Sequence, residues 1–164
     1  MPNTSPNTSA TPADADQAGA ILEIDLDALG ANYDNLRHRA APAECGAVLK
    51  ADAYGLGSIQ VGPKLAAMGC RRFFVAHLAE GVALRKILGV APAIYVLNGP
   101  LPRTEAEFLH YDLLPVLNSP CQLEQWSGAA AARERTLGAG LHIDTGMARL
   151  GLTPVEAAEL AANP

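Results

Sequence analysis

Two short segments carry the side chains best suited to chemistry, and the first surrounds Lys50. The segment AVLKADAYGLG (47–57) places this lysine at the end of an apolar run, directly before a turn that contains Gly55 and Gly57. Functional side chains of β/α proteins gather at this end of the strands. A lysine among apolar neighbours loses hydration, which favours the neutral amine that attacks a carbonyl. The alternative is an ordinary lysine whose ammonium reaches solvent from the strand end.

The second segment, HIDTGMARLGL (142–152), follows another apolar run. Polar His142, Asp144 and Thr145 come first, and Arg149 follows a glycine turn. The planar guanidinium of an arginine there offers a fork for a carboxylate or an oxyanion. The alternative is a local pair between Asp144 and Arg149 that only fixes the turn. Because four βα steps separate the two segments, their side chains meet only if the sheet curls into a barrel.

Strands and helices are expected to alternate along most of the chain. Short apolar runs are followed by segments with the period of an amphipathic helix. The expected strands are residues 21–26, 46–51, 72–77, 93–98, 113–118 and 138–144. Three helix starts are indicated by capping pairs, which are Thr104 with Glu107, Ser119 with Gln122, and Thr153 with Glu156. The alternation indicates an α/β protein with a parallel sheet, either doubly wound or closed into a barrel.

Composition limits the class of protein further. The 164 residues carry a net charge of −5, which gives no basic footprint for nucleic acid, and no apolar run is long enough to span a membrane. Cys45, Cys70 and Cys121 form no C-x-x-C pair and fit a reducing, cytoplasmic compartment. Residues 1–19 contain almost no large apolar side chain, so we expect a disordered tail before a domain at 20–164.

Taken together, the two segments resemble those of alanine racemase, a pyridoxal 5′-phosphate enzyme built on a β/α barrel. The resemblance rests on EIDLDALGANYDNLR (23–37), VLKADAYGLG (48–57) and HIDTGMARLGL (142–152). It implies that residues 20–164 form the N-terminal part, about five βα units, of a (β/α)₈ barrel of the TIM type. It also implies a truncated chain, because a complete barrel normally needs at least roughly 200 residues.

The resemblance assigns roles to three side chains. Lys50 would bind the aldehyde of pyridoxal 5′-phosphate covalently and would then serve as the base that handles the proton of the D-enantiomer. The protonated pyridoxal ring would be the electron sink. Tyr54 would hydrogen-bond the cofactor phosphate, and Arg149 would contact both the substrate carboxylate and the phenolic oxygen of the cofactor.

Three further residues are expected to orient Arg149. Asp144 and Thr145 would shape the turn that aims its guanidinium. Many members of the family have a lysine where this chain has His142, and that lysine can be carbamylated to hold the arginine. A histidine cannot form this carbamate, so the resemblance leaves open how Arg149 is held.

The implied function is the interconversion of L-alanine and D-alanine, which supplies D-alanine for cell-wall peptidoglycan. Members of the family form homodimers, and the second base is a tyrosine from the C-terminal domain of the partner subunit. Because this sequence does not include that domain, we expect the chain to be inactive alone. The alternatives are another barrel-type pyridoxal-phosphate racemase, acting on serine or on many amino acids, or a non-catalytic cofactor-binding fragment. The histidines show no metal-ligand spacing, so no metal is expected.

Overall fold

Five parallel strands form one sheet in the order of the sequence, β1-β2-β3-β4-β5, in a computed structural model that describes residues 18–162. The strands are β1 (Ala47–Val48), β2 (Arg72–Val75), β3 (Ala93–Val96), β4 (Leu114–Leu117) and β5 (Gly140–Leu141). The register places Ala47 opposite Phe73, and Tyr95 opposite Leu114. A doubly wound sheet reverses its strand order at a switch point, whereas a barrel wall does not. The sequential order therefore confirms the prediction of a partial β/α barrel.

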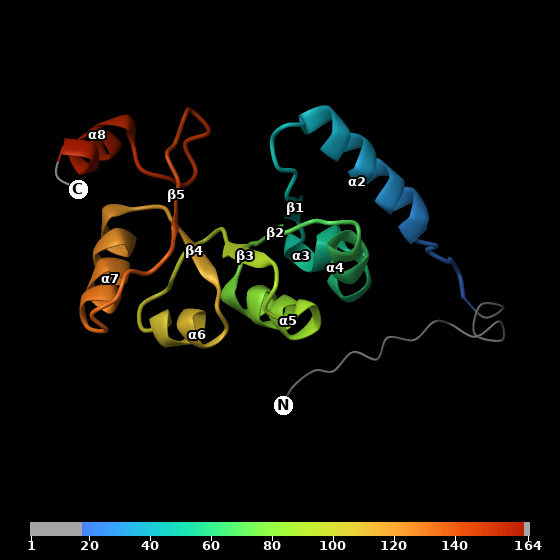
Figure 1. Ribbon diagram of the computed structural model, residues 1–164, viewed down its shortest axis with the longest axis horizontal. Coiled ribbons are helices and arrows are strands. Elements are labelled where there is room, and N and C mark those ends of the chain that lie inside the picture. Colours follow the sequence, from blue (N-terminus) through green and yellow to red (C-terminus); the bar gives the residue numbers. More distant parts are fainter. Residues whose placement is uncertain (1–17, 163–164) are drawn as a thin grey trace.

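Helices follow the strands and line one side of this wall. The helices are α2 (Leu26–Ala40), α3 (Lys50–Tyr54), α4 (Ser58–Ala67), α5 (Leu78–Leu88), α6 (Glu105–His110), α7 (Pro120–Ala131) and α8 (Pro154–Ala162). Figure 1 shows α4 to α7 in a row on one side of the strands, with α2 and α8 beyond the two ends of the sheet. None of the helices in the described part of the chain is long and apolar enough to cross a membrane.

The strand predicted at residues 21–26 is wrong. Ile21 and Leu22 are 69% and 74% exposed and belong to no strand. Alternating apolar residues form a strand only where a neighbouring strand supplies hydrogen bonds, and no strand of the described residues lies beside this segment. Asp25 instead caps α2, because its carboxylate accepts the amides of residues 27 and 28 over 2.8 and 2.9 Å. Apart from residues 18 and 19, the tail predicted at 1–19 lies outside the described residues.

Two of the three predicted helix caps are confirmed. Thr153 and Glu156 form a capping box, in which each side chain accepts the backbone amide of the other. The hydroxyl of Ser119 accepts the amide three residues further on, as expected at the start of α7. The capping box predicted at Thr104 is wrong, because its hydroxyl donates to the carbonyl of Leu101 over 2.7 Å.

The core lies between the sheet and the row of helices. Side chains that alternate along β2 and β3 are fully buried there, among them Phe73 and Ile94, and they meet Leu84 of α5 and Phe108 of α6. Burial of side chains of this size stabilises the fold by about 1.5–3 kcal/mol each. This packed layer is what holds the carboxyl ends of the strands in fixed positions.

A buried arginine ties the helices to the loops between the strands. Arg85 of α5 is 6% exposed, and its guanidinium donates to four backbone carbonyls. These belong to Gly89, Pro92, Tyr111 and Asp112, at 2.7, 2.8, 3.0 and 2.6 Å. Burial lowers the pKa of Arg85, and the nearby Asp112 carboxylate opposes that effect. The side chain thereby joins α5 to the entrances of β3 and β4.

Candidate active site

The chain leaves β1 in a left-handed turn, α3, that begins at Lys50. Residues Ala51 to Tyr54 all have φ between 51° and 57°. A side chain in this conformation crowds the backbone, at a cost of about 1–2 kcal/mol for each residue. The sequence predicted a glycine turn after Lys50, but the left-handed backbone starts at Ala51, before Gly55 is reached. Alanine and tyrosine give no sequence signal for such a turn.

Two carboxylates hold this turn in place. Asp52 accepts the Ser58 hydroxyl over 2.6 Å and the Ser58 amide over 2.7 Å, and these hydrogen bonds lower the pKa of Asp52 below its ordinary value. Glu80 of α5 accepts the Ala51 amide at Oε1 over 2.7 Å and the Ala76 amide at Oε2 over 2.7 Å. The turn is thereby tied both to α4 and to the start of α5.

The turn brings Lys50 and Tyr54 together. The Lys50 Nζ atom lies 5.9 Å from the centroid of the Tyr54 ring, within the range of a cation–π contact. Lys50 is half-buried, and Tyr54 is 64% exposed. Two of the residues predicted for the cofactor site are therefore neighbours in the fold, and the tyrosine is accessible to a ligand.

The segment after β5 folds back on itself around Asp144. Its carboxylate accepts the amides of Gly146 and Ala148 at 3.0 to 3.1 Å, which lowers the pKa of Asp144 below its ordinary value. Asp144 forms no ion pair with Arg149, so the turn is fixed by backbone amides and not by a local charge pair. Arg149 is exposed and has no side-chain partner within residues 18–162. Thr145 is exposed too, and the part predicted for it stays a prediction.

A buried asparagine fixes the ring of His142. The Asn118 side chain donates from Nδ2 to the carbonyls of Leu97 and Val116, at 2.9 and 2.8 Å. Its Oδ1 atom then faces His142 Nδ1 at 2.8 Å. Since this oxygen only accepts, we assign the proton to Nδ1, which leaves Nε2 of the neutral ring as an acceptor. Asn118 thus sets both the orientation and the tautomer of His142.

The sequence did not predict Glu80, Asn98 and Asn118 as residues of this edge. Asn98 donates from Nδ2 to Nδ1 of His77 over 3.2 Å, whereas Asn118 accepts from Nδ1 of His142 at Oδ1. The available signal was the tripeptide V-L-N, which ends the apolar runs of both β3 and β4. Glu80 gave no signal, because a glutamate in the first turn of a helix is commonplace.

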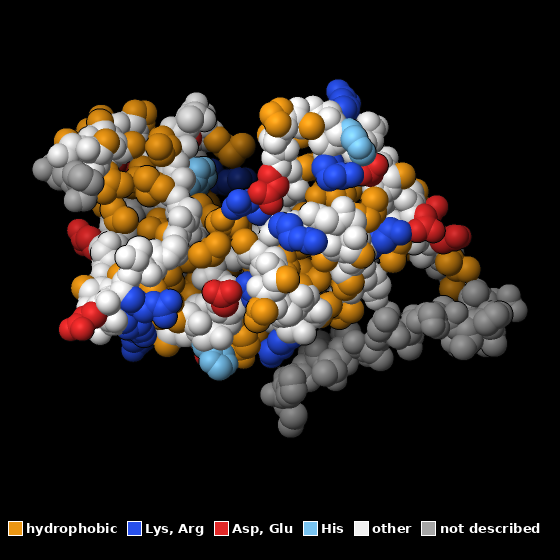
Figure 2. All heavy atoms as spheres, in the orientation of Figure 1, with side chains coloured by type: hydrophobic (Ala, Val, Ile, Leu, Met, Phe, Trp, Pro, Cys, Tyr) orange, Lys and Arg blue, Asp and Glu red, His pale blue; other side chains and the backbone are white. Residues whose placement is uncertain are grey.

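The two predicted segments lie at the same edge of the sheet but at opposite ends of the strand order. Lys50 follows β1 and Arg149 follows β5, and the carboxyl ends of parallel strands share one edge. No hydrogen bond or ion pair joins Arg149 to Lys50 or Tyr54 in the described part of the chain. Figure 2 shows a hollow between the α2 and α8 ends of the molecule, with basic and histidine side chains inside it.

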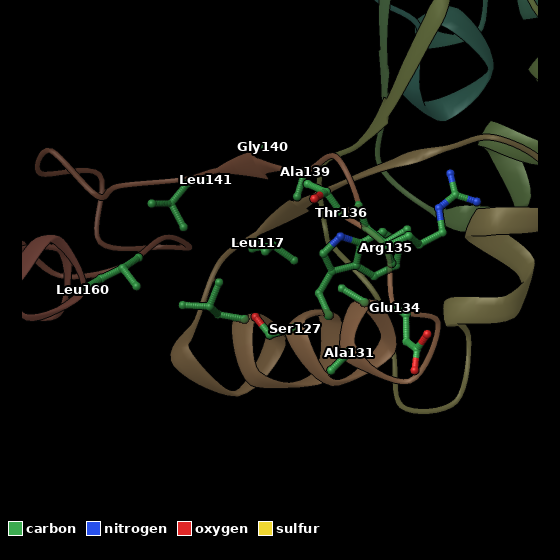
Figure 3. A pocket seen from close by; sticks show the side chains of 14 residues that line it. Leu117, Ser127, Ala131, Glu134, Arg135, Thr136, Ala139, Gly140, Leu141 and Leu160 are labelled. Carbon is green, nitrogen blue, oxygen red and sulfur yellow. The ribbon is translucent and has the colours of Figure 1, made fainter. Parts of the chain in front are cut away.

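A separate, apolar cavity of about 750 Å³ lies between α7, β5 and α8. Leu117, Leu141 and Leu160 point into it from three different elements (Figure 3). Trp126 also lines it, and its Nε1 atom is buried with no hydrogen-bond partner among the described residues. None of the predicted site residues lines this cavity. The carboxyl edge of the sheet is therefore the candidate site, because Lys50, Tyr54 and Arg149 all follow strands that end there.

Comparison with known proteins agrees with this geometry. The family model for the N-terminal domain of alanine racemase matches residues 24–164. The alanine racemase of Rhodospirillum rubrum is 48% identical over 150 residues, which is 91% of this chain and 40% of that protein. The alanine racemase of Brucella ovis is 50% identical over 146 residues, which is 89% of this chain and 37% of that protein.

Solved structures give the same picture. Alanine racemase from Bartonella henselae, with covalently bound pyridoxal phosphate, superposes with a TM-score of 0.82 at 39% identity, over 86% of this chain and 39% of that one. Alanine racemase from Streptomyces coelicolor gives a TM-score of 0.77 at 32% identity, over 85% and 37% of the two chains. The chain spans about two fifths of the length of these relatives. By the family match, the strand order and the two motifs, the chain belongs to the family of alanine racemase N-terminal domains.

Proposed function

We propose that this chain supplies the lysine and arginine side of the active site of a pyridoxal-phosphate-dependent alanine racemase. The observation that carries the proposal is the left-handed turn at Lys50. Backbone strain of this kind persists only where surrounding contacts hold it, and it clusters at functional sites. Here Asp52 and Glu80 hold it and place Lys50 beside Tyr54. Alanine as the substrate is supported by the names of the similar proteins.

The side chains present fit pyridoxal 5′-phosphate. The cofactor has an aldehyde that an amine attacks, a phosphate that a phenol can hydrogen-bond, and a phenolic oxygen that a guanidinium can bind. Lys50, Tyr54 and Arg149 supply them from one edge of the sheet, and the solved Bartonella relative holds this cofactor covalently. When bound, the cofactor would withdraw the electrons released as the substrate loses its α-proton.

Lys50 would anchor the cofactor and then accept and return a proton at Nζ. A base must lie within hydrogen-bond reach of the proton that it moves, and the turn fixes the direction in which Lys50 leaves the sheet. The hydroxyl of Tyr54 would donate a hydrogen bond to the phosphate. Because its ring lies against Lys50, it also limits where the ammonium can move.

His142 would hold Arg149 in place of the carbamylated lysine found in other members of the family. With Nδ1 bound to Asn118, the Nε2 atom is left to accept a hydrogen bond from a guanidinium. Asp144 would aim Arg149 indirectly, since it binds the amides on both sides of residue 147. Arg149 would then be free to bind the substrate carboxylate through its planar fork.

The chain spans about two fifths of the length of its relatives, and we expect the complete site to include residues from the remaining part. We expect the second base from the C-terminal domain of a partner subunit, and hence a homodimer. The chain alone would bind the cofactor but would not racemise alanine. Free Cys45 and Cys70 support a reducing, cytoplasmic setting, in which the product D-alanine would enter peptidoglycan synthesis.

The test is reductive trapping on the purified chain. Borohydride fixes the bond between an amine and the aldehyde of pyridoxal phosphate, and peptide mass spectrometry then locates it. The sequence contains three lysines, so Lys64 and Lys86 serve as internal references. We expect trapping at Lys50 in preference to both, and no racemisation of L-alanine. Equal labelling of the three lysines would refute the cofactor site, and racemisation by this chain alone would contradict the need for a partner.

The relative rates on alanine and serine distinguish the proposed alanine racemase from a racemase of other amino acids. A racemase for serine or for many amino acids would share the cofactor site described here. A version of the protein extended to the length of its relatives should racemise alanine faster than serine at equal concentrations. A preference for serine would replace alanine in the proposal and leave the cofactor site intact.

A further inference from the structure

The carboxylate of Glu80 joins two strand ends that are far apart in the sequence. Its Oε1 atom accepts the amide of Ala51, 29 residues away, over 2.7 Å. Its Oε2 atom accepts the amides of Ala76 and His77, at the exit of β2, over 2.7 and 3.0 Å. One side chain therefore satisfies three backbone donors from the loops that follow β1 and β2.

The turn at Lys50 needs such an anchor. Four consecutive non-glycine residues in the left-handed region do not persist without outside contacts. Packing holds only part of the turn, because Ala53 is 3% exposed in the core whereas Asp52 borders a cavity of about 350 Å³. Asp52 and Ser58 line this cavity together with Glu80. The hydrogen bond from the Ala51 amide to Glu80 holds the first left-handed residue of the turn.

Helix capping alone does not account for Glu80. Glu80 is the third residue of α5, where a carboxylate ordinarily serves the amides at the start of its own helix. Those are the amides bound by Oε2. The Oε1 atom, by contrast, is directed to the residue that follows Lys50. Capping requires no such contact.

We propose that Glu80 is a positioning residue for Lys50, and that it sets the direction of the lysine amine toward the cofactor. This inference rests on the proposed function of Lys50. Glu80 touches neither Lys50 Nζ nor any group assigned to the cofactor. It acts through the Ala51 amide and the left-handed turn.

Two substitutions of Glu80 distinguish the contact of Oε1 with the turn from the contacts of Oε2 with the start of α5. Glu80→Gln keeps the shape but replaces one accepting oxygen by an amide group that donates. If the remaining oxygen keeps the amides of Ala76 and His77, the Ala51 amide loses its acceptor. Glu80→Asp keeps the charge but is one methylene shorter, so it retains the helix cap and falls short of Ala51. The matched control is Glu107→Gln, since Glu107 also lies third in its helix, α6, and makes no contact with the turn.

The experiment measures two quantities on the intact chain and its variants. Amide hydrogen exchange at Ala51 reports whether the turn is held, and exchange in β3 reports whether the sheet is still folded. Pyridoxal phosphate followed by borohydride gives the labelling of Lys50 relative to Lys64 and Lys86. We expect both Glu80 variants to exchange the Ala51 amide at least about tenfold faster and to lower the relative labelling of Lys50 by a similar factor, because a hydrogen bond to a charged group is worth at least that factor.

The outcomes distinguish this inference from the proposed function. A wild-type chain that labels its three lysines equally would refute the cofactor site, and the positioning role with it. A selective wild-type chain whose Glu80 variants keep the same preference for Lys50 would refute the positioning role alone, even with faster exchange at Ala51. Loss of the preference in Glu107→Gln would show a general effect of lost charge and would overturn the inference as well.

Discussion

Replacing Asn118 by leucine is the sharpest test of how the carboxyl edge of the sheet is built. Asn118 is 7% exposed and lies where β4 ends. Its side chain bonds to the carbonyls of Leu97 and Val116 and to the ring of His142, so it joins the ends of β3, β4 and β5. Leucine has nearly the same shape and makes none of these bonds.

The size of the effect follows from those contacts. Each neutral hydrogen bond contributes about 1 kcal/mol, and the carbonyls of Leu97 and Val116 lose their side-chain donor within a buried region. The apolar side chain recovers about 1 kcal/mol through burial. We expect Asn118→Leu to lower the free energy of unfolding by about 2–3 kcal/mol, which lowers the Tm of a chain of this size by about 5–10 °C.

The assay is thermal and urea unfolding followed by circular dichroism, and the chain offers a matched control. Asn98 ends the same V-L-N tripeptide one strand earlier, but it is exposed and its side chain makes a single hydrogen bond, with His77. Asn98→Leu should change the free energy of unfolding by less than about 1 kcal/mol. If the two variants unfold within about 0.5 kcal/mol of each other, the network around Asn118 does not hold the strand ends.

Two further predictions concern the scaffold and the arginine turn. Arg85→Met should lower the free energy of unfolding by about 3–5 kcal/mol, because four carbonyls lose a buried donor; a loss below about 1 kcal/mol in urea unfolding would contradict this. The lowered pKa of Asp144 means that the carboxylate stabilises its turn above the ordinary value of 3.8, and that this stabilisation is lost as the pH falls through the lowered pKa. NMR shifts of the Gly146 and Ala148 amides should therefore titrate with a midpoint below 3.8, and a midpoint at or above 3.8 would count against the hydrogen bonds.

The sequence predicted the βα repeat and the places of both motifs well. Apolar runs, glycine turns and the caps at Ser119 and Thr153 are local signals, and local contacts satisfy them in the fold. The segment at 21–26 shows the limit of such signals. Its alternation is that of a strand, but a strand also needs a neighbour, and local pattern does not reveal whether one is present.

The contacts that shape the candidate site could not be predicted from local sequence patterns, because they join residues far apart in the sequence. Glu80 meets Ala51 across 29 residues, and Asn118 meets His142 across 24. Such pairs follow from the register of parallel strands, which the sequence does not encode locally. The left-handed backbone after Lys50 could not be predicted either. A hydrogen bond to the distant carboxylate of Glu80 holds residues there that favour other conformations.

We propose that this fold presents Lys50 as the amine that binds pyridoxal phosphate. The most direct measurement is the distribution of borohydride-trapped cofactor over the three lysines of the wild-type chain. Lys64 lies in α4, where it is paired with Asp27, and Lys86 lies in α5, so neither follows a strand at the carboxyl edge of the sheet. We expect Lys50 to carry most of the trapped cofactor. Trapping spread evenly over the three lysines, or concentrated at Lys64 or Lys86, would contradict it.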